Sequence, residues 1–299
     1  MAKIYVSGLV NTETTVKVRK FPIDYYPIDY PFFGVQTQVS GVAYNVAKAL
    51  TTLGDGVYLA SMIGRDIQAD VVERTLQKDG IGLEGIRREL PQTPSSVVLY
   101  DDSGRRQIYC DLKDIQEREY VCDREKIAGC DLIAACNISF NRNLLPMAKA
   151  MGKEIVTDVH VLSDVEDDYN REFLENANIV FLSDEGLPCD PGEFLWRLHC
   201  RYHNDILVLG RGEKGAMLYD QREDAFYELP CVPANVVNTV GAGDALFSAF
   251  LHFYGKGMKP VDALWRAQVF ASAKTEVSGA SQGFLTEGEV ELRWASRRS

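Results

Sequence analysis

The chain has 299 residues, of which 46% are hydrophobic and 25% are charged. These proportions are those of an ordinary globular protein, and the length allows about one or two domains. The formal net charge is −11, which argues against a broad nucleic-acid-binding surface, because such surfaces are basic. A local basic site for a phosphorylated ligand remains compatible with this charge.

The apolar stretch within residues 1–11 is too short to span a membrane, and no other segment approaches that length. The seven cysteines are odd in number and form no C-x-x-C pair. Scattered thiols of this kind are typical of a reducing compartment. We therefore expect a cytoplasmic protein without a membrane partner.

Short strand-like runs alternate with helix-like runs along the chain. In chain order, the strand-like runs are residues 3–8, 57–64, 131–136, 154–159, 178–183 and 205–210. Residues 41–54 and 66–80 carry apolar side chains at helical spacing and end in glycine. Several of the strand-like runs are continuously apolar, as in strands buried on both faces. The pattern predicts an α/β fold with a central, mostly parallel sheet flanked by helices.

Two regions depart from this alternation. Residues 12–39 alternate polar and apolar positions, and residues 96–110 look like a hairpin that turns at 102–104. We expect both to form a small antiparallel β lid within a single domain that spans residues 1–299. The exposed edge of such a sheet could pair with a second copy, so a homodimer through the lid is one expectation.

The first lid region is also rich in aromatic rings, and the second carries two arginines. The rings could stack on a nucleobase, or they could form the lid core or a dimer contact. Arg105 and Arg106 could meet an anionic substituent of a ligand, or they could belong to a solvated turn. The rings are Tyr25, Tyr26, Tyr30, Phe32 and Phe33.

The segment Gly241-Ala242-Gly243-Asp244 directly precedes an apolar run at helical spacing. These small residues would therefore lie at a helix N-terminus, where free backbone N–H groups and the helix dipole favour an anion. An aspartate there would repel the anion. It has a clear use as a general base that takes a proton from a hydroxyl group while the backbone holds a phosphoryl group.

This segment and two others resemble the signatures of the ribokinase-like, or PfkB, carbohydrate kinase family. The C-terminal signature of that family reads approximately D-T-x-G-A-G-D-x-F, and residues 238–247 read N-T-V-G-A-G-D-A-L-F. Its N-terminal signature has two glycines, then an asparagine, then a helix ending in Leu-Gly, which is similar to residues 40–54. A third element, Gly-x-x-Asn-x-acid, is matched by Gly8, Asn11 and Glu13. The resemblance covers essentially the whole chain.

The resemblance implies transfer of the γ-phosphoryl group of ATP, with Mg²⁺, to a hydroxymethyl group of a sugar or nucleoside. Asp244 would be the general base, and the backbone of Gly241, Ala242 and Gly243 would form the anion hole. The lid would close over the acceptor and exclude water. The residues implied to bind the acceptor are Asn11, Glu13, Gly41, Asn45 and Asn137.

For the nucleotide, the resemblance implies Gly210, Gly212 and Gly215, together with Gln268. The three glycines also match G-x-G-x-x-G, the fingerprint of dinucleotide-binding units. That alternative needs a helix at the third glycine, and the residues that follow, 216–220, look like a strand. A β-turn between two strands is the other interpretation, and it is compatible with a kinase.

Four departures from the family pattern affect these expectations. Glu13 replaces the usual Asp, so the carboxylate lies about one methylene further out. Ser40 replaces the first glycine of its pair. Asn238 replaces the Asp that helps to bind a monovalent cation in many relatives, and the uncharged amide makes activation by K⁺ doubtful. The N-x-x-E element tied to Mg²⁺ is replaced by 183–186, where Asp184 or Glu185 could organise metal-bound water or be exposed loop acids.

The sequence thus favours an ATP-dependent kinase for a primary hydroxyl of a small sugar or sugar derivative. Two alternatives remain: a nucleoside kinase of the same family, and a sugar or nucleotide sensor that has this fold without the catalytic activity. Neither a nucleic acid nor a membrane is expected as a partner.

Overall fold

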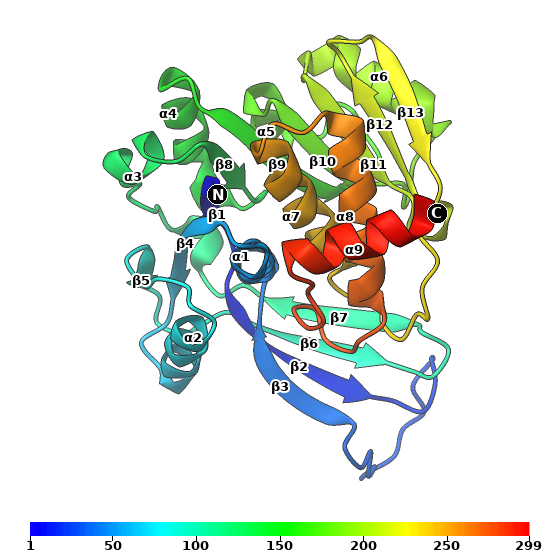
Figure 1. The fold of residues 1–299 in the computed structure, drawn as a ribbon. Coiled ribbons are helices and arrows are strands. Elements are labelled where there is room, and N and C mark those ends of the chain that lie inside the picture. Colours follow the sequence, from blue (N-terminus) through cyan, green and yellow to red (C-terminus); the bar gives the residue numbers. More distant parts are fainter. Residues whose placement is uncertain (299) are drawn as a thin grey trace.

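A nine-stranded sheet forms the centre of the computed structural model, which describes residues 1–298 (Figure 1). The strand order is β13-β12-β11-β10-β9-β8-β1-β4-β5. The strands from β11 to β5 are parallel, and β12 and β13 are antiparallel at one edge. The bounds are β1 Lys3–Ser7, β4 Gly56–Ile63, β5 Ile86–Arg88, β8 Leu132–Ala135, β9 Glu154–Val161, β10 Ile179–Ser183, β11 Ile206–Gly210, β12 Ala216–Asp220 and β13 Ala225–Leu229.

Helices cover both faces of this sheet, as predicted, because successive residues of a strand point to opposite faces. Val6 of β1 packs in the core shared with α1, α2, α7, α8 and α9, whereas its neighbour Tyr5 packs in the core shared with α3 to α6. The first group comprises α1 Val42–Leu53, α2 Ile67–Lys78, α7 Ala242–Gly255, α8 Pro260–Thr275 and α9 Glu287–Arg298. The second comprises α3 Arg124–Ala128, α4 Leu144–Ala150, α5 Arg171–Asn176 and α6 Pro191–Tyr202. Three short 3₁₀ turns are η1 Ile115–Glu117, η2 Ser139–Asn143 and η3 Gly212–Lys214.

The lid is a separate sheet in the order β3-β2-β6-β7 (Figure 1). Its strands are β2 Asn11–Lys17, β3 Val35–Ser40, β6 Ser95–Tyr100 and β7 Arg106–Asp111. The pairs β2–β3 and β6–β7 are antiparallel, as predicted, and the two pairs are joined by a parallel contact between β2 and β6. Residues 18–34 form an irregular loop between β2 and β3.

The aromatic rings of this loop do not form a lid core. Tyr25, Phe32 and Phe33 are 89%, 85% and 97% exposed. This outcome corrects one of the two interpretations of the rings and leaves a ligand or a second protein surface as their possible contact.

The carboxyl ends of the parallel strands meet at one edge of the large sheet, which is where α/β proteins bind ligands. The chain passes from β1 directly into β2, so the lid continues from this edge. All seven cysteines are free thiols. Within residues 1–298, no helix combines the length and the apolar character that crossing a membrane requires.

Candidate active site

The N-terminus of α7 forms a loop of small residues at the carboxyl edge. Gly241 is the N-cap of this helix, with a φ of 79°, and a Cβ there would lie 2.2 Å from the carbonyl oxygen of Ala280. Only glycine fits such a backbone without a shift. A Cβ at Gly243 would meet no described atom within 4 Å. Ala242 lies between the two glycines, and its backbone N–H donates to the carbonyl oxygen of Thr239 at 3.1 Å. The other first N–H groups of the helix are the ones suited to an anion.

Asp244 follows in the first turn of α7, and its carboxylate is held by α1. Asn45 Nδ2 donates a hydrogen bond of 2.7 Å to Asp244 Oδ2. Asp244 is partly buried, and the loss of solvation raises the pKa of its carboxyl above the usual range. The hydrogen bond from Asn45 and the charge of His160 oppose this effect, whereas the charges of Asp158 and Glu13 add to it.

Two buried amide oxygens of residues implied to bind the acceptor have no hydrogen-bond partner among residues 1–298. Asn11 Nδ2 donates to Ser96 Oγ at 3.1 Å, and Asn11 Oδ1 is left unpaired. Asn45 Oδ1 is also unpaired. Most buried polar atoms in proteins are paired, so these two acceptors are suited to hydroxyl groups of a bound ligand.

Two residues that depart from the family pattern contact each other. Ser40 Oγ donates to Glu13 Oε2 at 3.3 Å, and Gln38 Nε2 donates to the other carboxylate oxygen at 3.4 Å. Gly41 follows with a φ of 102°, and a Cβ there would lie 2.4 Å from the carbonyl oxygen of Leu9. The hydroxyl group gained at position 40 thus supports the longer carboxylate at position 13.

Asn137 lies just after β8 and contacts the segment between β9 and α5. Its Nδ2 donates to Asn170 Oδ1 at 3.2 Å, and its carbonyl oxygen accepts from the Tyr169 hydroxyl at 2.9 Å. One amide N–H of Asn137 is therefore engaged within the protein, so its predicted contact with the acceptor would use the remaining groups.

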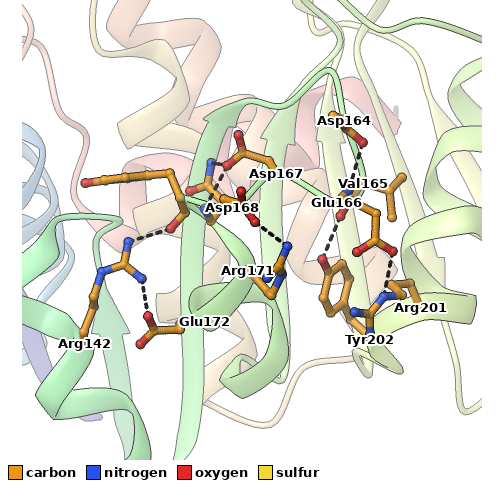
Figure 2. A network of polar contacts seen from close by, with 12 residues as sticks. Arg142, Asp164, Val165, Glu166, Asp167, Asp168, Arg171, Glu172, Arg201 and Tyr202 are labelled. Carbon is orange, nitrogen blue, oxygen red and sulfur yellow. Dashed lines mark hydrogen bonds and ion pairs between the residues drawn. The ribbon is translucent and has the colours of Figure 1, made fainter.

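A polar network anchors that segment on both sides (Figure 2). Arg142 of η2 donates to the carbonyl oxygen of Tyr169 at 2.7 Å, and Arg201 of α6 donates to Glu166 at 2.8 Å. The Tyr202 hydroxyl of α6 also bonds the segment, at the carbonyl oxygen of Val165. The segment beside Asn137 is thus fixed to two neighbouring elements.

The three glycines implied for the nucleotide form a hairpin turn between β11 and β12. Gly210 ends β11, Gly212 begins η3, and Gly215 has a φ of 90°. A Cβ at Gly215 would lie 2.0 Å from the carbonyl oxygen of Leu229. Strand β12 begins at Ala216, so no helix opens at the third glycine. This excludes the dinucleotide-binding interpretation and leaves the β-turn.

Gln268 lies in α8, which contacts β12 of the same hairpin. Its side chain is 6% exposed, and its Nε2 has no hydrogen-bond partner among the described residues. A buried amide without a partner is again compatible with a ligand contact.

The acids considered for the metal follow β10. The backbone N–H of Asp184 donates to the carbonyl oxygen of Gly210 at 2.9 Å, while Glu185 is exposed. In residues 1–298, no group of three or more His, Cys, Asp and Glu could hold a metal ion by itself. Mg²⁺ bound to nucleotide phosphates needs only one or two protein carboxylates, so these two acids fit that role.

Several charged residues near Asp244 were missed by the sequence predictions. Asp158 and His160 lie at the end of β9, with His160 Nδ1 3.5 Å from Asp158 Oδ2. Lys274 lies in the last turn of α8, and its Nζ donates to the carbonyl oxygen of Asn238 at 3.3 Å. A signal existed for the first pair, because polar residues that end an apolar parallel strand face the ligand edge. Lys274 gave no signal, since it reads as an ordinary residue of an amphipathic helix.

Asn238 itself shapes the loop before the anion hole. Its Oδ1 accepts a hydrogen bond of 2.8 Å from the backbone N–H of Val240. The side chain that replaces the usual Asp is therefore engaged in a local turn.

Comparisons with known proteins identify the family of the chain. The family model described as "pfkB family carbohydrate kinase" matches residues 1–287. The chain is 27% identical over 264 residues to fructosamine kinase FrlD of Bacillus subtilis, an alignment that covers 86% of this chain and 89% of that protein.

Solved structures show the same fold. A microbiome-derived acarbose kinase, Mak1, superposes with a TM-score of 0.88 at 23% identity, over 99% of both chains. Ribokinase of Arabidopsis thaliana, solved with ribose and ATP, superposes with a TM-score of 0.80 at 20% identity, over 97% of this chain and 98% of that one. The chain described here belongs to the pfkB family of carbohydrate kinases.

Proposed function

We propose that this kinase transfers the γ-phosphoryl group of ATP to a primary hydroxyl of a small sugar or sugar derivative, with Asp244 as the general base. The observation that carries the proposal is the 2.7 Å hydrogen bond from Asn45 to Asp244. It joins the acceptor side of the site to the helix N-terminus that would hold the phosphoryl group.

The chemistry follows from these two residues and the loop before them. A base whose pKa is raised toward the operating pH accepts a proton more readily than an ordinary aspartate does. Asn45 orients the carboxylate, so one oxygen is held and the other is left for the acceptor hydroxyl. The N–H groups of Gly241 and Gly243 would stabilise the negative charge that develops on the transferring group. Ala242, whose N–H donates to the carbonyl oxygen of Thr239, would shape the anion hole between them.

The remaining predicted residues divide between the two substrates. Asn11, Glu13, Gly41, Asn45 and Asn137 would position the acceptor, and the unpaired oxygens of Asn11 and Asn45 are the parts suited to its hydroxyl groups. The hairpin after β11 and Gln268 would contact the nucleotide. Mg²⁺ would be held by Asp184 or Glu185 and would neutralise phosphate charge.

A nucleoside acceptor is the alternative, and the exposed rings of residues 18–34 favour it. Flat aromatic side chains stack on nucleobases at little conformational cost. The same rings also support a homodimer through the lid, because monomeric proteins rarely expose a cluster of large apolar side chains. Of the two uses, stacking on a nucleobase and contact with a second copy, we infer the contact with a second copy.

The acceptor can be found by measuring ADP release from Mg-ATP with sugars, sugar acids, fructosamine and nucleosides. Turnover that depends on one sugar or sugar derivative supports the proposal, and turnover with nucleosides alone supports the alternative. If ATP and a sugar both bind, as measured by calorimetry, but no acceptor gives turnover, the protein is a sensor and the proposed kinase activity is wrong.

A further inference from the structure

Lys274 is a fully buried lysine for which the phosphoryl-transfer chemistry described above has no use. Its side chain is 0% exposed, although lysine is almost never buried in proteins unless it is paired. Among residues 1–298, the hydrogen bond that the structure records for Nζ goes to the carbonyl oxygen of Asn238 at 3.3 Å. None of the ion pairs among the described residues, including those of α8 and α9, involves Lys274.

The ammonium group contacts the segment that leads into the anion hole. The end of α8 is joined to the chain before the hole, because the backbone N–H groups of Val237 and Asn238 donate to the carbonyl oxygen of Thr275 at 2.8 and 3.0 Å. Three residues after Asn238, Gly241 packs against the backbone of Ala280. The contact of Lys274 with Asn238 thus supports the segment that leads into the anion hole.

The surrounding charges indicate that the group remains cationic. Burial lowers the pKa of Lys274 to about 8, the charges of Asp244 and Glu13 raise it, and that of Arg106 lowers it. A lysine with this pKa is about nine-tenths protonated at pH 7. A buried cation costs more free energy than an apolar side chain of the same length, so a charge retained here is expected to have a use.

We propose that Lys274 is a positioning residue whose ammonium group acts as a resident cation behind the anion hole, in the place of an exchangeable monovalent cation. Backbone carbonyl oxygens are the usual ligands of such ions, and Nζ occupies that position at Asn238. The charge stabilises the phosphoryl group through the loop, without touching it. This inference rests on the proposed function, and it explains why an uncharged Asn is tolerated at position 238.

Two substitutions separate charge from packing. Lys274→Met keeps the length of the side chain and removes the charge, whereas Lys274→Ala also leaves a space that a small cation can enter. Lys149→Met, on the exposed face of α4, is the matched control. Rates of ADP release and thermal unfolding are measured in tetramethylammonium chloride and in KCl or NH₄Cl at equal ionic strength.

We expect wild type to have the same rate of ADP release in all three salts, and Lys149→Met likewise. Both Lys274 variants should lose about 100-fold in kcat, with the KM of the acceptor little changed. NH₄⁺ should raise the kcat of Lys274→Ala at least tenfold and leave the kcat of Lys274→Met unchanged. A wild-type rate that K⁺ raises severalfold, or a folded Lys274→Met variant with the wild-type kcat, would overturn the inference.

Unfolding temperatures decide the matter if no acceptor is turned over, since that failure concerns the proposed function alone. A cation that binds only the folded state raises the unfolding temperature. NH₄⁺ should therefore stabilise Lys274→Ala and leave wild type unchanged. Stabilisation of wild type by K⁺, or none of Lys274→Ala by NH₄⁺, contradicts a resident cation.

Discussion

At the scale of single residues, the site depends on the carboxylate of Asp244, whose charge lowers the stability of the fold. Burial raises the pKa of Asp244 in the folded state. Such a group favours folding at a pH below its ordinary pKa, and that contribution is lost as the pH rises through the folded value. At neutral pH the ionised carboxylate therefore destabilises the protein.

We predict that Asp244→Asn is more stable than wild type at neutral pH. The unfolding temperature should rise by a few degrees, and the difference should disappear in acid, where both forms are uncharged. Thermal unfolding monitored by circular dichroism across this pH range measures it, with Asp262→Asn, a half-exposed acid in the first turn of α8, as the control. Equal unfolding temperatures at neutral pH would show that burial does not disfavour the charge.

Ser40 and Glu13 give a second prediction at this scale. Removing the hydroxyl group that donates to Glu13 should raise the KM of the acceptor about tenfold and change kcat little. Ser40→Ala removes the hydroxyl group alone, and Ser40→Gly also restores the residue of the family pattern. Steady-state kinetics should give the same KM for both variants. If the KM of the acceptor changes in Ser40→Gly but not in Ser40→Ala, the effect comes from the backbone and not from the lost hydroxyl group.

At the scale of elements, we expect the two glycines at the N-terminus of α7 to have different roles: Gly241 is needed for packing and Gly243 for catalysis. A side chain at Gly241 would collide with the backbone of Ala280, whereas one at Gly243 would extend into open space. We predict that Gly241→Ala loses about 1–3 kcal/mol of folding free energy. Gly243→Ala should fold at least as stably as wild type, because alanine favours helices, yet lose tenfold or more in kcat.

Chemical denaturation and kinetics of this pair of variants check both expectations. The opposite order, with Gly243→Ala destabilised and active, would mean that the loop does not hold the phosphoryl group.

The elements themselves could be predicted to a large extent from the sequence. Apolar runs such as 178–183 indicate buried parallel strands, and the hairpin turn at 102–104 was found from its residues. Periodicity reports local structure only, however, so it could not show that β2 pairs in parallel with β6 or that Ser40 reaches Glu13. The nearness of Asn45 to Asp244 was implied by the family resemblance alone. The buried charge of Lys274 depends on tertiary packing that has no sequence pattern.

At the scale of the whole molecule, the lid presents an apolar surface of residues 18–34 that no other part of residues 1–298 covers. We predict a dimer at micromolar concentrations, measured by sedimentation equilibrium. Replacing both Phe32 and Phe33 by serine should shift the protein toward the monomer by tenfold or more in the dissociation constant. Val121→Ser, an exposed apolar residue elsewhere, is the control. A wild-type protein that is monomeric at all concentrations would refute the lid interface.

The measurement that tests the central claim most directly is the kcat of Asp244→Asn at saturating ATP and acceptor. If Asp244 is the general base, kcat should fall by about 10²–10⁴-fold, while Asp262→Asn keeps the wild-type rate and calorimetry shows that both variants still bind ATP. A folded Asp244→Asn variant with a kcat within tenfold of wild type would contradict the assignment, and with it the role given to the hydrogen bond from Asn45.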